Sequence, residues 1–292
     1  MNQMKIFVYG TLRKGERNAG LLENATCIAE QCWRDGELYD TGYGYPAMKN
    51  SQGTRVYGEL YTVTEDALQR LDQLEGYIEG GKNNLYERME QTVYSDKGSG
   101  VAYMYVASQA NLLNRKISNG DWKEFNLLSK PNGSVLYFAY GSCMDMQRIT
   151  EAGYAHYFKD VLGVGVLPNY TLRFTRKSSM DGMGRADIVQ EGGMIEGKVY
   201  NLPIKALKEY LYGREGAPKV YRPTFVTIEL NGKEVQALTF VVTNKGAETA
   251  PPQWYEDEIL RGAKGYLSQD YVTELKSHMN SLKKSILNIG GM

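Results

Sequence analysis

Cysteine and histidine are scarce in this chain of 292 residues, which contains three of the first and two of the second. Zinc sites and disulfide frameworks need such residues at characteristic paired spacings, and none of those spacings occurs here. We therefore expect no metal centre and no disulfide framework. The five residues are Cys27, Cys32, Cys143, His156 and His278.

The sequence also lacks an excess of charge, because Lys plus Arg and Asp plus Glu both number 34. Such a chain has no long-range attraction for nucleic acid or an anionic membrane, so we expect a small-molecule partner instead. No apolar run approaches the length of a membrane span, and Lys5 interrupts an N-terminus that lacks the organisation of a signal peptide. We expect a cytoplasmic protein, and its oligomeric state stays open.

Tyrosine, by contrast, is abundant, with 23 residues. It alternates with aliphatic residues in stretches such as GVAYMYVA and GKVYNL, which is the period of two expected for β-strands. The length of the chain favours two compact units, each large enough to bury its own core. We therefore expect two domains rich in β-structure.

A sequence motif at the start of the chain recurs in its second half. Residues 6–15 read IFVYGTLRKG and residues 137–146 read YFAYGSCMDM, so an apolar strand twice runs into tyrosine, glycine and a small residue bearing a hydroxyl. Further along, TRVYGELYTV and GMIEGKVYNL bring Gly58 and Gly197 into corresponding places. Matches in the same order at separated places indicate an internal repeat.

A glutamate on a predicted helix follows in the first half. Thr64 is a suitable N-cap for the segment ALQRLDQLEGY, and Leu68, Leu71 and Glu75 share one face of that helix. Glu75 therefore projects from the apolar side of the helix.

The second half repeats this arrangement in ALKEYLYGREGA. Pro203 suits a helix start, and Leu207, Leu211 and Glu215 again share one face. Gly213 weakens the case for a continuous helix. Both Glu75 and Glu215 are nevertheless expected to point inward.

A carboxylate on an apolar face is costly to bury without partners, and burial raises its pKa toward the range useful for proton transfer near neutral pH. For a single glutamate, the simpler interpretation is a helix end whose side chain bends out to solvent. Duplication in the same context favours a functional role for Glu75 and Glu215.

The two opening loops permit a similar interpretation. A glycine directly after a strand allows a tight turn whose successive amides can converge on an anion, although ordinary turns have the same composition. With an inward glutamate in each half, we interpret the loops at Gly10 and Gly141 as binding loops. Because neither histidine recurs in the first half, Cys143 is expected to be buried and inert rather than nucleophilic.

A YG[ST] loop after the first strand, combined with a glutamate in an LDxxE context, resembles the gamma-glutamylcyclotransferase-like family. Residues 4–107 are similar to the branch that includes gamma-glutamylamine cyclotransferase, through VYGTLRKG, YPAM, GELY and LDQLEGY. Residues 134–283 are more similar to gamma-glutamylcyclotransferase proper, through YFAYGS, LPNYTLRF, VVTNKGAETAPPQWY and RGAKGYLSQDYVTELK. We expect domains over 1–107 and 134–292, the second with a C-terminal helix, and a polar linker over 108–133.

The resemblance implies an α+β fold in which each domain is a small closed β-barrel with flanking helices. It also implies a reaction: the α-amine of a gamma-glutamyl group attacks its own gamma-carbonyl, forms 5-oxoproline and releases the attached amine or amino acid. No cofactor is needed. In the family the YG loop holds the glutamyl head through backbone amides, and the glutamate exchanges protons with the reacting amine.

Carried onto this sequence, the resemblance assigns Glu75 and Glu215 as catalytic residues. The substrate-binding loops would be Tyr9, Gly10, Thr11 and Leu12 in the first unit and Tyr140, Gly141, Ser142 and Cys143 in the second. Tyr86 and Tyr221 are candidates to stabilise the oxyanion through their hydroxyl groups.

The second unit departs from the family pattern. Cys143 stands where asparagine is common, and Tyr212 stands where the first unit has Asp72. Pro223 takes the place of Arg88, so the two pocket entrances are expected to differ. Three hypotheses stay open: an enzyme with two active units, an enzyme in which one unit only supports the other, and a module that binds gamma-glutamyl or other carboxylated metabolites without turnover.

Overall fold

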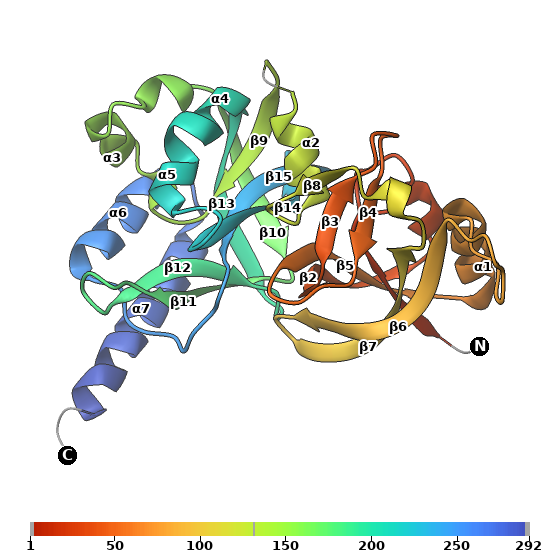
Figure 1. The fold of residues 1–292 in the computed structure, drawn as a ribbon. Helices are drawn as coiled ribbons and strands as arrows, with labels where there is room; N and C mark the ends of the chain where they lie inside the picture. Colours follow the sequence, from red (N-terminus) through yellow and green to blue (C-terminus); the bar gives the residue numbers. More distant parts are fainter. Residues whose placement is uncertain (1–2, 131, 290–292) are drawn as a thin grey trace. The chain divides into compact units, whose positions relative to one another are not determined.

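The computed structural model describes residues 3–130 and 132–289, and the chain divides into two compact units between Asn126 and Leu127. Figure 1 shows the first unit in red to yellow and the second in green to blue. Pro131, one of the residues that suggested a linker, lies outside the described residues.

The first unit is built around a closed barrel of five strands in the order β1-β5-β2-β6-β7. β1 lies antiparallel to β5 and parallel to β7, and this mixed pairing closes the barrel. The strands are β1 (Met4–Val8), β2 (Thr26–Asp35), β5 (Arg55–Val63), β6 (Tyr86–Ser95) and β7 (Gly98–Ala107).

Smaller elements complete this unit. A three-stranded sheet has the order β4-β3-β8, and two α-helices and two short 3-10 helices stand outside the strands. The strands are β3 (Glu37–Asp40), β4 (Pro46–Lys49) and β8 (Arg115–Ile117). The helices are η1 (Ala19–Leu22), α1 (Glu65–Glu75), η2 (Ala110–Leu112) and α2 (Trp122–Leu128), whose last two residues lie beyond the boundary at Asn126.

The second unit contains a barrel of the same design, in the order β10-β13-β9-β15-β14. β9 is antiparallel to β13 and parallel to β15, as β1 is to β5 and β7. The strands are β9 (Ser134–Ala139), β10 (Val161–Pro168), β13 (Met194–Pro203), β14 (Tyr221–Leu230) and β15 (Lys233–Val242). The expected pair of closed barrels in an α+β fold is therefore confirmed.

The second unit carries more helical structure than the first, together with a separate hairpin of β11 (Thr171–Lys177) and β12 (Gly184–Val189). One helical run consists of α4 (Ile204–Ala206), the π-helix η5 (Leu207–Leu211) and α5 (Tyr212–Glu215). The others are η3 (Ser142–Met144), α3 (Met146–Glu151), η4 (Ala155–Tyr157), α6 (Gln253–Ala263) and α7 (Gln269–Ile289).

The paired glycines explain part of the repeat in physical terms. A Cβ atom on Gly58 would lie 2.7 Å from the ring of Phe7, and one on Gly197 would lie 2.7 Å from the ring of Phe138. Both distances are well inside van der Waals contact, so a side chain at either position would displace the aromatic ring on the neighbouring strand. The correspondence between Gly58 and Gly197 is confirmed.

The helix that carries Glu75 begins and ends as expected. The hydroxyl of Thr64 accepts a hydrogen bond from the amide of Ala67 at 3.3 Å, which caps α1. Gly76 follows Glu75 with φ of 62°, a left-handed conformation that ends the helix at a residue without a Cβ. Leu68 and Leu71 are buried on the inner face.

The helical run before Glu215 is less regular. It passes through a π-helical turn, and Gly213 lies within its last segment without interrupting it. Gly216 then repeats the left-handed end, with φ of 59°. At the C-terminus, the hydroxyl of Ser268 accepts from the amide of Tyr271 at 3.2 Å and caps α7, the expected C-terminal helix.

Much of the segment predicted to be a linker is folded into the first unit. Within 108–133, the chain up to Asn126 belongs to that unit, and β8 pairs with β3. The side chain of Asp121 accepts a hydrogen bond at 2.9 Å from Arg13, which is only 1% exposed. The polar composition suggested solvent exposure, but here an acidic residue neutralises a buried arginine.

Candidate active site

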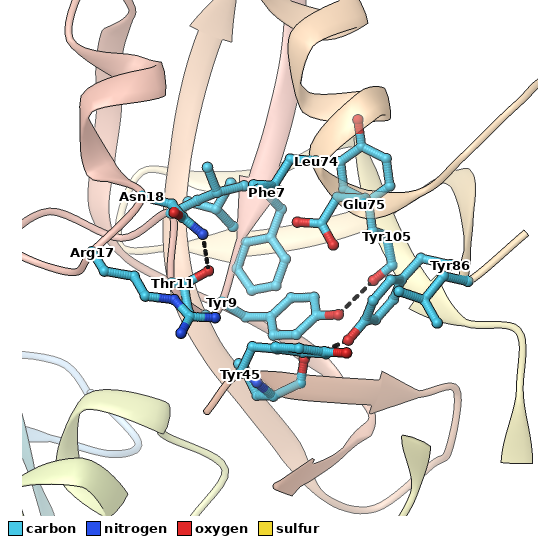
Figure 2. Close-up of a pocket in the computed structure, with 15 residues that line it drawn as sticks. Phe7, Tyr9, Thr11, Arg17, Asn18, Tyr45, Leu74, Glu75, Tyr86 and Tyr105 are labelled. Atoms are coloured by element: carbon cyan, nitrogen blue, oxygen red, sulfur yellow. Dashed lines mark hydrogen bonds between the residues drawn. The ribbon is translucent and has the colours of Figure 1, made fainter. Parts of the chain in front are cut away.

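The first unit holds a cavity of about 240 Å³ beside the loop that follows β1. It is bounded by the barrel strands, the end of α1 and the start of β4, as Figure 2 shows. All of the site residues predicted in this unit line it: Tyr9, Gly10, Thr11, Leu12, Glu75 and Tyr86.

Glu75 reaches this cavity from the last turn of α1. Figure 2 shows its carboxylate directed into the space above the rings of Phe7 and Tyr9. Within the part of the chain that the structure describes, no group donates a hydrogen bond to this carboxylate. Burial raises the pKa of Glu75 to about 7, because the charged form loses hydration without gaining a partner. This carboxylate can therefore accept and return a proton near neutral pH.

The loop is held in place from several sides. The hydroxyl of Tyr9 donates to the carbonyl oxygen of Tyr105 at 2.7 Å, and Asn18 donates to the hydroxyl of Thr11 at 3.0 Å. A Cβ atom on Gly10 would lie 2.6 Å from Cγ of Pro46, so a side chain at Gly10 would collide with the proline that faces it.

Tyr86 lines the cavity, but its hydroxyl proton is already used in a hydrogen bond within the protein. It donates to the carbonyl oxygen of Pro46 at 2.9 Å. In the second unit, Tyr221 donates in the same way to the carbonyl oxygen of Ala186 at 2.8 Å. A hydroxyl has a single proton, so these two tyrosines hold the cavity wall instead of presenting a donor for an oxyanion.

The second unit has an equivalent cavity of about 160 Å³. The site residues predicted in this unit all line it: Tyr140, Gly141, Ser142, Cys143, Glu215 and Tyr221. The hydroxyl of Tyr140 donates to the carbonyl oxygen of Phe240 at 2.6 Å, which matches the bond from Tyr9 in the first unit. The two loops are therefore anchored alike.

Glu215 differs from Glu75 because it has charged and polar neighbours. Its Oε1 lies 3.3 Å from Nε of Arg214, and the thiol of Cys143 donates to the same oxygen at 3.5 Å. Arg214 also donates through Nη2 to the hydroxyl of Ser142 at 2.7 Å. Burial raises the pKa of Glu215, while the nearby Arg214 opposes this rise.

Cys143 is buried, as expected, and burial raises the pKa of its thiol above the usual range. A raised pKa disfavours the thiolate, which is the nucleophilic form. Its sulfur accepts a hydrogen bond from Nε of Arg214, and its thiol donates to Glu215.

Sequence reasoning missed the arginines of these cavities. Arg17 and Arg148 line the first and second cavity, and each follows its loop tyrosine at the same distance along the chain. Aligning the two halves of the sequence could have identified these two arginines as a shared feature. Arg185 and Arg214 of the second cavity have no arginine counterpart in the first unit, so comparing the halves for shared residues could not find them.

A second contrast lies beside the glutamates. In the first unit Arg88 pairs with Asp72 at 2.5 Å, and the hydroxyl of Tyr105 donates to Asp72 at 2.8 Å. The corresponding residues of the second unit are uncharged, and two of them are in aromatic contact with ring centroids 6.0 Å apart. They are Tyr212, Pro223 and Phe240.

Two further observations concern the described residues as a whole. They contain no group of three or more His, Cys, Asp or Glu side chains arranged to hold a metal ion. No helix among them is both long enough and apolar enough to cross a membrane.

A small closed barrel that presents a YG loop and an inward glutamate, built twice in one chain, defines a recognisable class of protein. The family described as gamma-glutamyl cyclotransferase, AIG2-like, matches residues 6–124, and the AIG2-like family matches residues 194–275. The chain belongs to the gamma-glutamylcyclotransferase family.

Particular relatives share this arrangement to different extents. The chain is 44% identical over 288 residues to the protein YkqA of Bacillus subtilis (strain 168), which covers 97% of this chain and 100% of that protein. The crystal structure of YkqA has a TM-score of 0.86, covering 96% of this chain and 99% of that one at 42% identity. The gamma-L-glutamyl-butirosin B gamma-glutamyl cyclotransferase of Niallia circulans is 38% identical over 123 residues, 42% of this chain and 77% of that protein.

Proposed function

We propose that this chain is a gamma-glutamyl cyclotransferase with two sites, which converts a gamma-glutamyl group into 5-oxoproline and releases the attached amine or amino acid. The observation that carries the proposal is the Glu75 carboxylate, which lies unpaired among the described residues beside the glycine loop, with a pKa of about 7. The relative from Niallia circulans, named for removing a gamma-glutamyl group by cyclotransfer, supports the same reaction class.

The reaction needs a base and then an acid at one position. The α-ammonium group of the ligand gives a proton to the Glu75 carboxylate, and the freed nitrogen attacks the gamma-carbonyl carbon. A bond forms between these two atoms, and the carbonyl oxygen takes up negative charge. The protonated glutamic acid then gives its proton to the leaving nitrogen, the original amide bond breaks as the carbonyl re-forms, and Glu75 is again a carboxylate. The ring nitrogen still carries one surplus proton, which passes through the Glu75 carboxylate to the released amine, so the products are a neutral lactam ring and an ammonium group. A group with a pKa near 7 serves both steps efficiently.

The loop supplies the binding half of the proposal. Within the described residues, no hydrogen bond engages the amides of Thr11 and Leu12, so these two donors can face a ligand carboxylate. Arg17 lines the same cavity and adds a positive charge. Holding the α-carboxylate here folds the flexible glutamyl chain toward ring closure, and orientation of this kind accounts for several kcal/mol in intramolecular reactions.

The second site has the same loop and glutamate, but its glutamate is already ion-paired before a ligand binds. Glu215 is paired with Arg214, which stabilises the charged form of the base but also weakens its attraction for a proton. This pairing favours an alternative for the second unit, namely that it binds carboxylated metabolites without turnover. The loop, the tyrosine anchor and the glutamate are nevertheless all retained, so we propose catalysis at both sites.

The test is to incubate the full chain with gamma-glutamyl amino acids, gamma-glutamylamines and glutathione, and to measure 5-oxoproline. The matched control is the double variant Glu75→Gln and Glu215→Gln, which keeps the side-chain shape but removes both bases. We expect product from the parent chain and none from the double variant, with folding of both checked by circular dichroism. Product from a folded double variant would contradict the proposed bases, and ligand binding without product from the parent would indicate a binding protein.

A further inference from the structure

Three polar side chains of the first unit meet beside Glu75 without taking part in the proposed reaction. They come from α1, β6 and β7 and are Asp72, Arg88 and Tyr105. Nη1 of Arg88 lies 2.5 Å from Oδ2 of Asp72, and the hydroxyl of Tyr105 donates to Oδ1 of the same carboxylate at 2.8 Å. Asp72 therefore connects the helix that carries Glu75 to two strands of the barrel.

Asp72 is also a neighbour of the base. It precedes Glu75 by three positions on α1, and residues at this spacing lie next to each other on a helix surface. Burial raises the pKa of the Tyr105 hydroxyl, Asp72 and Glu75 raise it further, and Arg88 opposes them. The charges of Asp72, Arg88 and Glu75 therefore all act at one place, the hydroxyl of Tyr105.

Tyr105 joins this group to the binding loop. Its carbonyl oxygen accepts the hydrogen bond from the hydroxyl of Tyr9 at 2.7 Å, while its own hydroxyl binds Asp72. Figure 2 shows Tyr105 between Tyr9 and the end of α1. One residue of β7 thus contacts both the glycine loop and the glutamate helix.

Arg88 supplies the positive charge of the group. Its guanidinium carbon lies 4.9 Å from the ring centre of Tyr77 and 5.2 Å from that of Tyr103, and only 17% of its side chain is exposed. Within the described residues Arg88 forms no ion pair with Glu75. A cation in this place would lower the pKa of a neighbouring carboxyl group if Asp72 did not neutralise it.

The second unit keeps the corresponding positions without the charges. Pro223 and Phe240 face each other across β14 and β15 as Arg88 and Tyr105 do across β6 and β7. Tyr212, which precedes its glutamate by three positions, contacts the ring of Phe240 with ring centroids 6.0 Å apart. An apolar contact is enough to connect helix and strand there, so the ion pair of the first unit points to a further role.

Few charged groups face Glu75 inside its cavity. The other ionisable side chains that line this cavity are one arginine and four tyrosines. They are Arg17, Tyr9, Tyr45, Tyr86 and Tyr105. The tyrosines are uncharged near neutral pH, and Arg17 lies with its guanidinium carbon 6.0 Å from the ring centre of Tyr45. Asp72 and Arg88 lie outside the cavity lining, so the charges around Glu75 are those of Arg17 and of this pair.

We propose that Asp72 is a positioning residue for the base of the first site. It neutralises Arg88 and holds it away from Glu75, so that the base stays unpaired, and through Tyr105 it fixes the last turn of α1 beside the loop. Without the charge of Asp72, an uncompensated cation lies near the base, and without Arg88 an uncompensated anion does. This inference rests on the proposed function only for the use of Glu75 as a base.

The test follows the acidic limb of the first site in the Glu215→Gln chain, which lacks the second base. Profiles of kcat/KM against pH, recorded with the gamma-glutamylamine or gamma-glutamyl amino acid that this chain converts, report ionisation in the free protein. Asp72→Asn should move the limb toward acid by about one pH unit, and Arg88→Met should move it toward base. The double variant Asp72→Asn, Arg88→Met removes both charges and should return the limb close to its original position.

Opposite shifts distinguish this role from a purely structural one. Loss of a contact that only stabilises the helix lowers activity in both single variants without moving their limbs in opposite directions. Asparagine has nearly the shape of aspartate and can still accept from Tyr105, so we expect Asp72→Asn to fold, which circular dichroism checks. If it does not fold, the direction of the shift in Arg88→Met decides alone. Asp66→Asn and Arg70→Met change exposed residues of the same helix and should leave the limb in place.

NMR of ¹³C-labelled glutamate carboxyl groups separates this inference from the proposed function, because it needs no turnover. The signal of Glu75 is identified by its absence from the spectrum of the Glu75→Gln chain and is titrated without ligand. Opposite shifts of the Glu75 pKa in Asp72→Asn and Arg88→Met support the inference even if no 5-oxoproline forms. Shifts in one direction, or none, overturn the inference, and 5-oxoproline formed by the same chains leaves the proposed function standing.

Discussion

The two units place the same carboxylate on the same barrel but surround it differently. In the first unit the nearby arginine, Arg88, is bound by Asp72, and Glu75 faces its cavity without a partner among the described residues. In the second unit the arginine lies immediately before the glutamate and pairs with it. The position of one arginine therefore distinguishes a carboxylate without a partner among the described residues of the first unit from an ion-paired carboxylate in the second.

The parts that the units share are those that would bind and react with a common group. Both units keep the loop glycine, the anchored loop tyrosine and the terminal glutamate. The differences lie in the cavity walls and beside the glutamates. Four predictions test this comparison, in order of decreasing effect.

The largest effect should come from removing both bases. Relative to either single variant, the double variant Glu75→Gln, Glu215→Gln should form 5-oxoproline roughly 10²–10⁴-fold more slowly, because general-base assistance has about that magnitude. Steady-state kinetics with a gamma-glutamyl ligand that the parent chain turns over measures this. Glu79→Gln and Glu229→Gln change exposed glutamates in the same two units and should have no effect. A folded double variant that is as active as either single variant would show that these two carboxylates are not the bases.

The next effect is a change in the free energy of unfolding. It tests the buried ion-pair cluster beside the first loop, which the second loop lacks. Arg13 follows the first loop and is paired with Glu59 and Asp121 in a buried cluster, whereas Met144 stands at the corresponding place in the second unit. Asp121→Ala should lower the free energy of unfolding by on the order of 3 kcal/mol, because it removes a partner from a buried charge.

Urea unfolding of the full chain, followed by tryptophan fluorescence, measures this loss. Asp66→Ala, which removes an exposed carboxylate in the same unit, serves as the matched control and should change stability by less than about 0.5 kcal/mol. A similarly small change for Asp121→Ala would indicate that the segment 108–126 contributes little to the first unit.

The third effect is a shift of the pH profiles in opposite directions. The first site should lose activity as the pH falls through about 7, because Glu75 must be ionised to accept a proton. Leu74→Arg adds a cation beside it, lowers its pKa and should move this limb toward acid by about one pH unit. Arg214→Leu removes a cation from Glu215, raises its pKa and should move the limb of the second site toward base.

Profiles of kcat/KM against pH measure the acidic limb of each site. The first site is recorded in the Glu215→Gln chain and the second in the Glu75→Gln chain. Arg70→Leu and Lys208→Leu remove exposed cations from the same two helices and act as controls. If both substitutions moved the acidic limb in the same direction, the assignment of Glu75 as an unpaired base and Glu215 as an ion-paired base would be contradicted.

The smallest effect should distinguish the starts of the two glutamate helices. Thr64→Ala removes the hydroxyl that caps α1 and should cost about 1 kcal/mol of unfolding free energy. Pro203 stands at the corresponding position without a side-chain cap, so Pro203→Ala should change stability by less than about 0.5 kcal/mol. Thermal denaturation of the two variants tests this, and equal losses would mean that the cap does not distinguish the helices.

The repeated elements were accessible from the sequence because they depend on local chemistry. Alternating tyrosines and aliphatic residues indicate strands, Thr64 caps a helix through its own hydroxyl, and Gly76 ends it through its left-handed backbone. Glu75 and Glu215 could be placed on inner faces because helical periodicity follows from the order of residues. The closed barrel came from the resemblance, since strand pairing over long distances leaves no local signal.

The segment 108–133 shows where composition misleads. Polar residues there predicted a linker, yet Asp121 lies 2% exposed against Arg13. Whether an acidic side chain is solvated or buried depends on the presence of a counter-charge from another part of the chain. That information becomes available only after the chain has folded.

The sequence by itself determined the duplication, the helices that carry Glu75 and Glu215, and the glycine loops that lie close to them. Only the tertiary structure decided which groups surround each carboxylate. Arg214 ties Glu215 to the loop, Tyr86 gives its proton to Pro46, and Arg185 faces the second cavity. The physical reason is one of range: helix caps, turns and face periodicity arise within a few residues, whereas desolvation and charge pairing depend on atoms that the fold brings together from distant positions.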